Sequence, residues 1–160
     1  MSSYCDILQS PVGPLYLLFK NALLTGISLS GRPAGIKRGK APAPLLSELE
    51  GYFEGKRREF TFPFALAGGT DFERKVWLAL RDIPYGETRS YKWLSEHIGH
   101  PKASRAVGQA LSKNPLPIVL PCHRVIESGG KLGGFSPDIS IKRRLLDLEY
   151  YYFRPPAFES

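Results

Sequence analysis

One short stretch of the sequence places a thiol, an imidazole and a guanidinium side by side. Cys122, His123 and Arg124 follow Pro121, and the residues on both sides of this group are apolar. The thiolate is the nucleophilic form of cysteine, and a neighbouring base or cation lowers the cysteine pKa from about 8.5. Polar groups between buried segments destabilise a fold unless they are paired or used. The stretch is therefore a candidate site for nucleophilic chemistry.

The sequence leaves open whether the thiol and the imidazole interact. The apolar run 118–120 predicts a short buried strand that ends at Pro121, because proline cannot donate to a strand ladder. Neighbouring side chains of a strand point to opposite sides, so Cys122 and His123 would need a bend or a bridging water to interact. An inert core cysteine is the commoner situation and remains an alternative.

A carboxylate near the end of the chain is the candidate third group. Residues 139–149 predict a helix with three apolar residues on its buried face, and Glu149 falls at the edge of that face. A carboxylate in such a place needs a partner. We therefore predict that Glu149 orients His123 and stabilises its charge, as the third group does in activated nucleophiles.

Two short helices upstream indicate a candidate DNA-binding surface. Ser90 is predicted to cap the first helix, and Gly99 to end it before Pro101 opens a second helix over 102–112. A tight turn between two helices, the second basic and rich in small residues, is typical of a helix-turn-helix. An ordinary pair of packed helices explains the pattern equally well. The outer stripe of the second helix consists of Lys102, Arg105, Ala106, Gln109 and Lys113.

The first half of the chain predicts a small sheet with one helix and carries no catalytic motif. Residues 4–30 have the strand and turn pattern of a β-meander. Residues 45–53 predict an amphipathic helix, and residues 60–64 alternate like a further strand.

A glycine-rich boundary at 67–69 separates this half from a helix whose capping box begins at Thr70. We expect an α+β protein with a domain over 1–67, a second domain over 70–153 and a tail over 154–160. The first domain is a small antiparallel sheet with a helix. The second is mainly helical and contains the helix-turn-helix and the reactive cysteine.

Composition narrows the partners and the location. The formal net charge is +7, and residues 89–113 hold five basic residues against one acidic residue, so nucleic acid is a plausible partner. No apolar run reaches the roughly 18–20 residues of a membrane span, and the N-terminus lacks a secretory signal, so a cytoplasmic protein is expected. Cys5, Cys122 and three histidines show no metal-ligand spacing, so no metal is expected.

The stretch 118–126 resembles the active-site motif of the O6-alkylguanine-DNA alkyltransferases, also called methylated-DNA–protein-cysteine methyltransferases. The resemblance covers about residues 70–150. It continues through segments 72–77, 83–88, 90–91, 103–108 and 112–115.

The resemblance implies a role for each matching residue of the site. Cys122 would accept the alkyl group from the O6 of guanine and form a water-linked network with His123 and Glu149. Asn114 would hold the turns around the site. Tyr91 would help to rotate the nucleotide and donate a proton toward the departing base.

The resemblance also implies a DNA surface and a base pocket. Arg105 would take the place of the flipped base, from a helix in the minor groove that Ala106 and Gly108 let approach closely. The remaining DNA-contacting residues are Arg89, Lys102, Gln109 and Lys113. The pocket would be lined by Pro117, Val125, Phe135 and Ser136, where this chain has Phe-Ser-Pro-Asp in place of the family's frequent Tyr-Ser-Gly-Gly.

The expected function is direct-reversal repair by one irreversible transfer per molecule, without a cofactor. The expected partner is double-stranded DNA that contains O6-alkylguanine, bound by a monomer. One alternative is a module that recognises alkylated DNA without repairing it, although relatives of that kind lack the cysteine. Another is a cysteine hydrolase, which would need an oxyanion hole.

Overall fold

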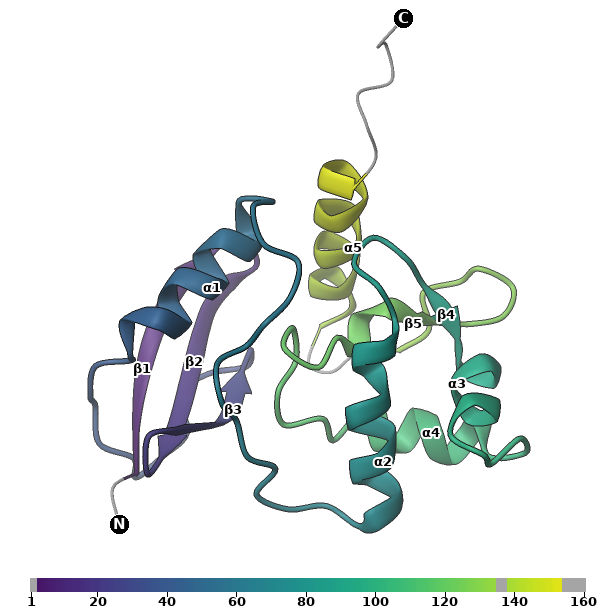
Figure 1. Cartoon of the computed structure of the whole chain (residues 1–160), viewed down its shortest axis with the longest axis horizontal. Helices are drawn as coiled ribbons and strands as arrows, with labels where there is room; N and C mark the ends of the chain where they lie inside the picture. The colour runs from purple at the N-terminus through teal and green to yellow at the C-terminus, as the bar shows by residue number, and fades with distance from the viewer. Residues whose placement is uncertain (1–2, 135–137, 154–160) are drawn as a thin grey trace, which may run out of the picture. The chain divides into compact units, whose positions relative to one another are not determined.

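The computed structural model of the protein describes residues 3–134 and 138–153, which form two compact units (Figure 1). The first unit contains the residues up to Gly68 and the short segment Pro115–Val119. The second unit contains Gly69–Asn114 and the described residues from Leu120 onward. No helix in the described part of the chain is both long and apolar enough to cross a membrane.

The first unit is built on the predicted meander. Strands β1 (Ser3–Ser10), β2 (Gly13–Lys20) and β3 (Leu23–Ser28) form an antiparallel sheet in that order. Alternate side chains of β2 are buried, as expected for a sheet with one face on the core. The turn between β2 and β3 has two consecutive positive φ angles, 52° at Asn21 and 67° at Ala22, which suit a tight hairpin.

Helix α1 (Ala43–Phe53) lies along one face of this sheet (Figure 1). It buries Leu45, Leu49 and Tyr52 completely, which confirms the predicted amphipathic helix. The segment Pro115–Val119 joins the unit through a hydrogen bond of 2.9 Å from Ile27 N to Pro115 O.

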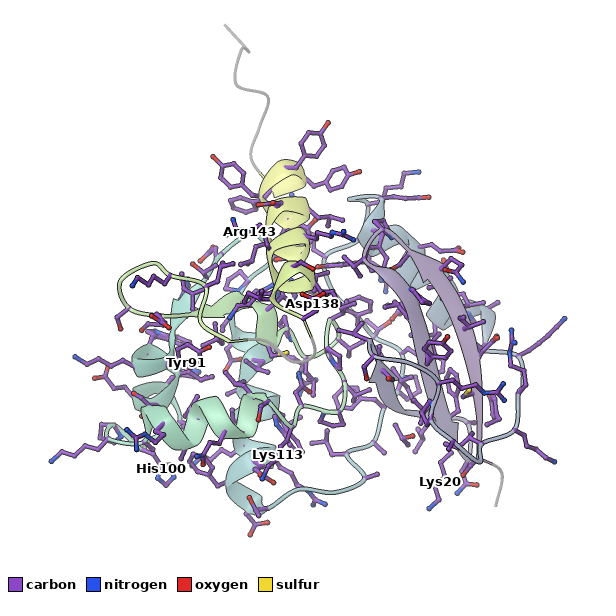
Figure 2. The ribbon with its side chains drawn as sticks, turned by 180° about the vertical axis from the view of Figure 1, so that it is seen from behind. Lys20, Tyr91, His100, Lys113, Asp138 and Arg143 are labelled. Carbon is purple, nitrogen blue, oxygen red and sulfur yellow. The ribbon has the colours of Figure 1, made fainter. Side chains whose placement is uncertain are left out.

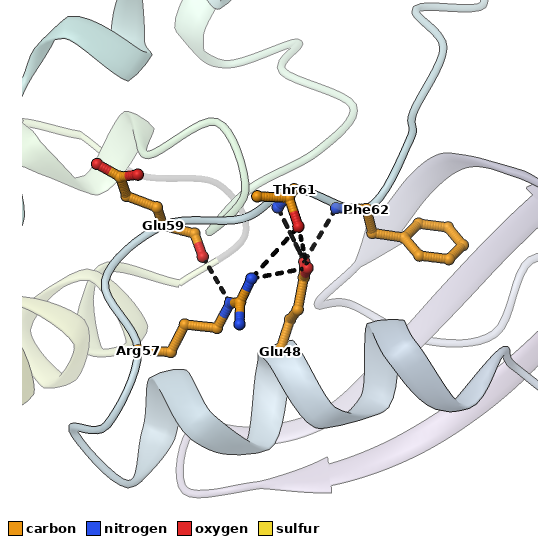
Figure 3. Close-up of polar contacts among 5 residues, drawn as sticks. All are labelled: Glu48, Arg57, Glu59, Thr61 and Phe62. Atoms are coloured by element: carbon orange, nitrogen blue, oxygen red, sulfur yellow. Dashed lines mark hydrogen bonds and ion pairs between the residues drawn. The ribbon is translucent and has the colours of Figure 1, made fainter.

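The predicted strand over 60–64 is wrong. The segment makes only a single bridge, between Leu24 and Phe64. Its backbone instead binds the buried carboxylate of Glu48 on α1, which accepts hydrogen bonds from Thr61 N at 3.1 Å and Phe62 N at 3.1 Å (Figure 3). Arg57 Nη2 also lies 3.0 Å from this carboxylate. The backbone N–H groups that would pair with a neighbouring strand thus donate to the Glu48 side chain instead.

The second unit begins as predicted. Thr70 and Glu73 form a complete capping box at the start of helix α2 (Asp71–Ala79), with N···O distances of 3.1 and 3.0 Å. A 3-10 turn, η1 (Leu80–Asp82), follows. The buried indole of Trp77 donates a 2.7 Å hydrogen bond to Ala110 O and so fastens α2 to helix α4 (Ser104–Leu111).

Helix α3 (Tyr91–His97) and α4 are the predicted helix pair. Strand β4 (Arg89–Ser90) leads into α3, and Ser90 Oγ caps it by accepting from Trp93 N at 2.9 Å. Helix α4 begins at Ser104, so the prediction that Pro101 opens it is wrong. The buried Ser95 hydroxyl accepts from Ala103 N at 3.1 Å and donates to His100 O, which holds the intervening residues in a turn.

The predicted strand over 118–120 is also wrong, although the run is buried as expected. Ile118 has a φ of 77°, a conformation that β-branched residues rarely adopt. Asn114 Nδ2 donates to Leu120 O at 2.8 Å and closes the chain between them into a loop. Prolines at 115, 117 and 121 lack the N–H groups that a strand ladder needs.

Two further elements complete the second unit. Strand β5 (Val125–Ile126) pairs in parallel with β4. Helix α5 (Ile139–Phe153) extends four residues beyond the predicted end at Glu149. Its buried positions include Ile141 and Leu145, in agreement with the predicted inner face.

Candidate active site

The three residues of the reactive motif form one turn of 3-10 helix, η2 (Cys122–Arg124), rather than an extended strand. Cys122 N donates to Leu120 O at 2.7 Å, and Arg124 N donates to Pro121 O at 3.1 Å. All three side chains are buried. The chain therefore bends at this turn, which is one of the two conditions named above for an interaction between Cys122 and His123.

Helix α5 brings Glu149 to this turn. Glu149 Oε2 lies 2.6 Å from His123 Nε2, and both side chains are at most 1% exposed. The backbone N–H of Gly86 adds a longer hydrogen bond of 3.2 Å to Glu149 Oε1. The structure therefore brings together the two residues that the sequence predicted as imidazole and third group.

Arg124 also binds this carboxylate, a role that the sequence analysis did not predict. Its Nε lies 2.8 Å from Glu149 Oε1 and its Nη2 lies 3.0 Å from Oε2, a bidentate pair. Its Nη1 donates to Ile83 O at 2.8 Å. The position of Arg124 directly after the Cys-His pair was the only available signal.

The electrostatics of the buried cluster favour a neutral imidazole. Burial lowers the pKa of His123, and the positive charge of Arg124 adds to this, while Glu149 opposes it. Burial opposes ionisation of Glu149, but the hydrogen bonds from His123 and Arg124 and the charge of Arg124 outweigh it, so the pKa of Glu149 lies well below its ordinary value. A neutral His123 then donates from Nε2 to the carboxylate, which leaves the lone pair on Nδ1. Nδ1 is buried and accepts no hydrogen bond from the described residues.

The thiol of Cys122 is held in its protonated form in the resting protein. Burial raises its pKa, while a hydrogen bond from Asn114 and the positive charge of Lys142 oppose the rise. Asn114 therefore contacts both the thiol and the carbonyl of Leu120, which fits the predicted role of holding the turns around the site.

Tyr91, the first residue of α3, is half-buried beside a glycine-rich loop, residues 129–134 (Figure 2). A Cβ added to Gly133 would lie only 2.6 Å from the Tyr91 hydroxyl, so a side chain there would displace the phenol. Burial and the negative charge of Glu127 raise the pKa of Tyr91, while a hydrogen bond with the backbone of Gly134 opposes this rise. Tyr91 stays protonated and can donate.

Lys142 is a second site residue that the sequence analysis missed. It is 1% exposed, and its Nζ donates to Val125 O at 2.6 Å and to Gly134 O at 3.2 Å. Burial lowers its pKa to about 8. The spacing of 142, 145 and 149 on one helix face could have revealed it, because a lysine in line with Leu145 and Glu149 must be buried.

The side chains predicted to face DNA lie on α4, on the turns beside it and, in the case of Arg89, on β4. Gly108 is partly buried, and a Cβ added there would meet the Tyr91 ring at an ordinary 3.8 Å. The exposed members of the predicted set are Lys102, Arg105, Ala106, Gln109 and Lys113.

Two of the predicted phosphate contacts are already ion-paired. Lys113, just beyond α4 in Figure 2, places its Nζ 3.2 Å from Glu73 Oε2. Arg89 Nη2 lies 2.8 Å from Glu87 Oε1, and its guanidinium carbon lies 5.4 Å from the centre of the Trp93 ring. DNA phosphates would have to compete with these two carboxylates.

The predicted pocket residues are only partly described. Val125 is fully buried, and Pro117 is buried in the segment that belongs to the first unit. Phe135 and Ser136 lie outside the described residues. Within residues 3–134 and 138–153, no group of three or more His, Cys, Asp or Glu side chains could hold a metal ion.

Comparison with known proteins decides the family. A family model described as the DNA binding domain of 6-O-methylguanine DNA methyltransferase matches residues 71–151. A second model, the ribonuclease-like domain of the same methyltransferase, matches residues 3–66. The chain belongs to the 6-O-methylguanine DNA methyltransferase family. The resemblance seen in the reactive motif and the expected α+β fold are thereby confirmed.

Individual members of the methyltransferase family match along nearly the whole chain. The methylated-DNA–protein-cysteine methyltransferase of Methanosarcina barkeri is 44% identical over 156 residues, covering 91% of this chain and 96% of the relative. The crystal structure of the Mycobacterium tuberculosis O6-methylguanine methyltransferase has a TM-score of 0.88 at 40% identity, covering 97% of this chain and 96% of the other. A structure of the M. tuberculosis protein in complex with DNA has a TM-score of 0.87 at 40% identity, covering 93% and 94%.

Proposed function

We propose that this methyltransferase repairs O6-alkylguanine in double-stranded DNA by moving the alkyl group onto Sγ of Cys122. One observation carries the assignment: a buried thiol lies on the same turn as an imidazole whose Nε2 is held by Glu149. Nδ1 of that imidazole is free to accept a proton. Membership of the family identifies the reaction, and this geometry supports Cys122 as the acceptor.

The reaction balances without a cofactor. The thiol proton of Cys122 passes through a bridging water to His123 Nδ1, and Glu149 stabilises the imidazolium. The thiolate attacks the alkyl carbon, so a C–S bond forms as the C–O6 bond breaks. The electron pair stays on guanine, which takes a proton from Tyr91, and the proton on His123 later restores the phenol through solvent. The net change converts Cys–SH and O6-methylguanine into Cys–S–CH3 and guanine.

Delivery of the base requires that it leave the duplex, because its O6 is otherwise inaccessible to a buried thiol. Arg105 is exposed on α4 and takes the space of the flipped base in the stack. Lys102, Lys113 and Arg89 bind phosphates, which gives affinity without reading sequence. Such binding suits a protein that must find damage in any sequence context.

Each molecule reacts once, and one copy of the chain suffices. The thioether on Cys122 is not hydrolysed back to a thiol, so the reaction stops after one equivalent. Cys122, His123, Glu149 and Tyr91 all belong to one unit of one chain. A monomer therefore contains the complete acceptor site.

Mass spectrometry tests the assignment. We expect incubation with an oligonucleotide duplex bearing O6-methylguanine to add one methyl group per protein, on the peptide that contains Cys122. The methylated fraction should saturate at one equivalent. An unmodified Cys122 in protein that binds this DNA tightly would instead favour a module that only recognises damage.

A Cys122→Ala variant is the matched control. It removes the acceptor and leaves the helix pair unchanged, so it should bind the same duplex and transfer nothing. Methyl transfer by this variant would show that the acceptor lies elsewhere. Steady turnover of an acyl ester by the unaltered protein, abolished in the variant, would point to a cysteine hydrolase.

A further inference from the structure

The reactive turn and α5 enclose a small cluster of charges with almost no contact with solvent. His123 is 0% exposed, Glu149 1% and Arg124 5%. Glu149 lies between the other two, within 2.6 Å of the imidazole and 2.8 Å of the guanidinium. Because burial penalises net charge, the protonation states in this cluster are coupled.

The charge balance of the cluster depends on Arg124. With arginine and the carboxylate both ionised, the cluster is neutral when the imidazole is neutral. Without arginine, a protonated imidazole would become the hydrogen-bonded cation that balances the carboxylate. A His123 that is already protonated has no lone pair with which to accept the thiol proton.

We propose that Arg124 is a positioning residue that supplies the counter-charge of Glu149 and thereby keeps His123 uncharged and ready to act as a base. This inference rests on the proposed function of Cys122. Arg124 touches neither the thiol nor the alkylated base in this scheme, and acts only through Glu149 and His123.

The geometry around Arg124 fixes its guanidinium in place. Two of its nitrogens bind the two carboxylate oxygens, and the third binds Ile83 O at 2.8 Å. Its Cζ also lies 5.6 Å from the centre of the Tyr85 ring. The planar guanidinium, bound through all three nitrogens, offers the carboxylate a positive charge and two parallel donors. A lysine ammonium cannot reproduce this geometry.

The other charged and titratable groups around His123 shift its pKa in opposite directions. Lys142 on α5 lowers the pKa of His123 as Arg124 does, and Glu149 raises it. Cys122 on the same turn is held as a neutral thiol mainly by burial. Lys142 donates to Val125 O and Gly134 O, so backbone carbonyls hold its positive charge near His123.

The consequence for repair is a shift in pH dependence. The reactive thiolate–imidazolium state contains one proton on the Cys122–His123 pair, as does the resting state with a neutral imidazole. Loss of the Arg124 charge favours a second proton on the pair at neutral pH. That proton must leave before transfer, so the acid limb of the rate profile should move to higher pH.

The test compares single-turnover methyl transfer to Cys122 across pH in three variants. Arg124→Gln keeps donors toward Glu149 but removes the charge, and its acid limb should rise by about 1 to 3 pH units, the usual effect of a nearby charge. Arg124→Lys keeps the charge and loses the fork, so it should be slower with the limb near its original pH. Lys142→Met, which removes a charge held by backbone carbonyls, should move the limb less than Arg124→Gln.

A rate that falls equally at all pH values in Arg124→Gln would overturn the inference, because a merely structural role has that outcome. So would the same shift in Arg124→Lys as in Arg124→Gln. Nitrogen NMR measures the protonation state of the His123 ring directly in the unaltered protein, so this test does not depend on whether a variant folds. We expect a neutral Nε2–H tautomer at pH 7, and a protonated ring there would contradict the proposal. Because this spectrum is independent of methyl transfer, failure of Cys122 as acceptor remains distinguishable.

Discussion

Glu149 links the chemistry of the site to the stability of the second unit. Four hydrogen bonds reach its carboxylate, from Gly86 N, His123 and two nitrogens of Arg124. Removing one partner of a buried ion pair leaves the other charge unpaired. The residue is therefore as necessary for folding as it is for orienting the imidazole.

We predict that Glu149→Gln lowers the free energy of unfolding by about 3–5 kcal/mol, because the buried Arg124 loses its counter-charge. The folded-state pKa of Glu149 is depressed, so its stabilising effect is present above the unfolded pKa of about 4.3 and is lost as pH falls below it. Urea denaturation at several pH values measures both effects. The stability difference between the two proteins should shrink in acid.

The exposed carboxylate of Asp82, 2.8 Å from His97, offers the matched control. An Asp82→Asn change removes a charge at the surface and should leave stability nearly unchanged. Equal losses in the two variants would show that burial of the Glu149 pair is not the cause.

The glycine-rich loop 129–134 borders the site at Tyr91. Gly133 and Gly130 both have positive φ angles, 74° and 88°, so alanine strains the backbone at either position. Only at Gly133 would the new Cβ meet Tyr91. At Gly130 it would meet no atom within 4 Å. Comparing alanine variants at these two positions therefore separates the effect of backbone strain from the effect of displacing the Tyr91 phenol.

We predict that Gly133→Ala slows methyl transfer by about 10- to 100-fold, because a catalytic group is displaced, while DNA affinity stays within about twofold. Gly130→Ala should transfer at nearly the original rate. Rapid-quench measurement at saturating duplex gives the rates. Similar slowing in both variants would assign the effect to backbone strain and remove the role of Tyr91.

Arg105 on helix α4 should act in base flipping, a step that a free alkylated base does not need. We predict that Arg105→Ala slows repair of a saturating duplex by about 10-fold or more, because flipping a base from the stack requires a few kcal/mol. Reaction with free O6-benzylguanine should be nearly unaffected. Lys102→Ala is the control, since a lost phosphate contact weakens affinity but not the rate at saturation. If Arg105→Ala slowed the reactions with duplex and with free base equally, Arg105 would not act by inserting into the base stack.

The whole molecule carries a net charge of +7, which should make its DNA affinity strongly dependent on salt. We predict that Lys102→Ala reduces the slope of log affinity against log salt by about 1, as expected for one lost phosphate contact. Lys113→Ala should reduce it less, because Lys113 already pairs with Glu73 in the free protein. Binding titrations at four salt concentrations measure the slopes. A larger change for Lys113 would contradict the competition between Glu73 and phosphate.

Features that depend on near neighbours in the chain could be predicted from the residues alone. Thr70 and Glu73 cap α2, Ser90 caps α3, and the alternation of β2 buries one face, because capping and periodicity act over a few residues. The reactive motif and its family resemblance were likewise readable in the printed sequence. The partnership of His123 with Glu149 followed from helix periodicity plus that resemblance.

The pairing of polar groups, in contrast, became visible only in the folded chain. Residues 60–64 do not form the predicted strand, because their backbone N–H groups donate to the Glu48 carboxylate. Residues 118–120 form a loop closed by Asn114 instead of a strand. Arg124 and Lys142 became part of the site because α5 and the turn η2 approach each other from positions distant in the sequence. A buried charge must be paired, and its partner often comes from a segment distant in the sequence. Local sequence patterns do not show which distant segments lie close together in the fold.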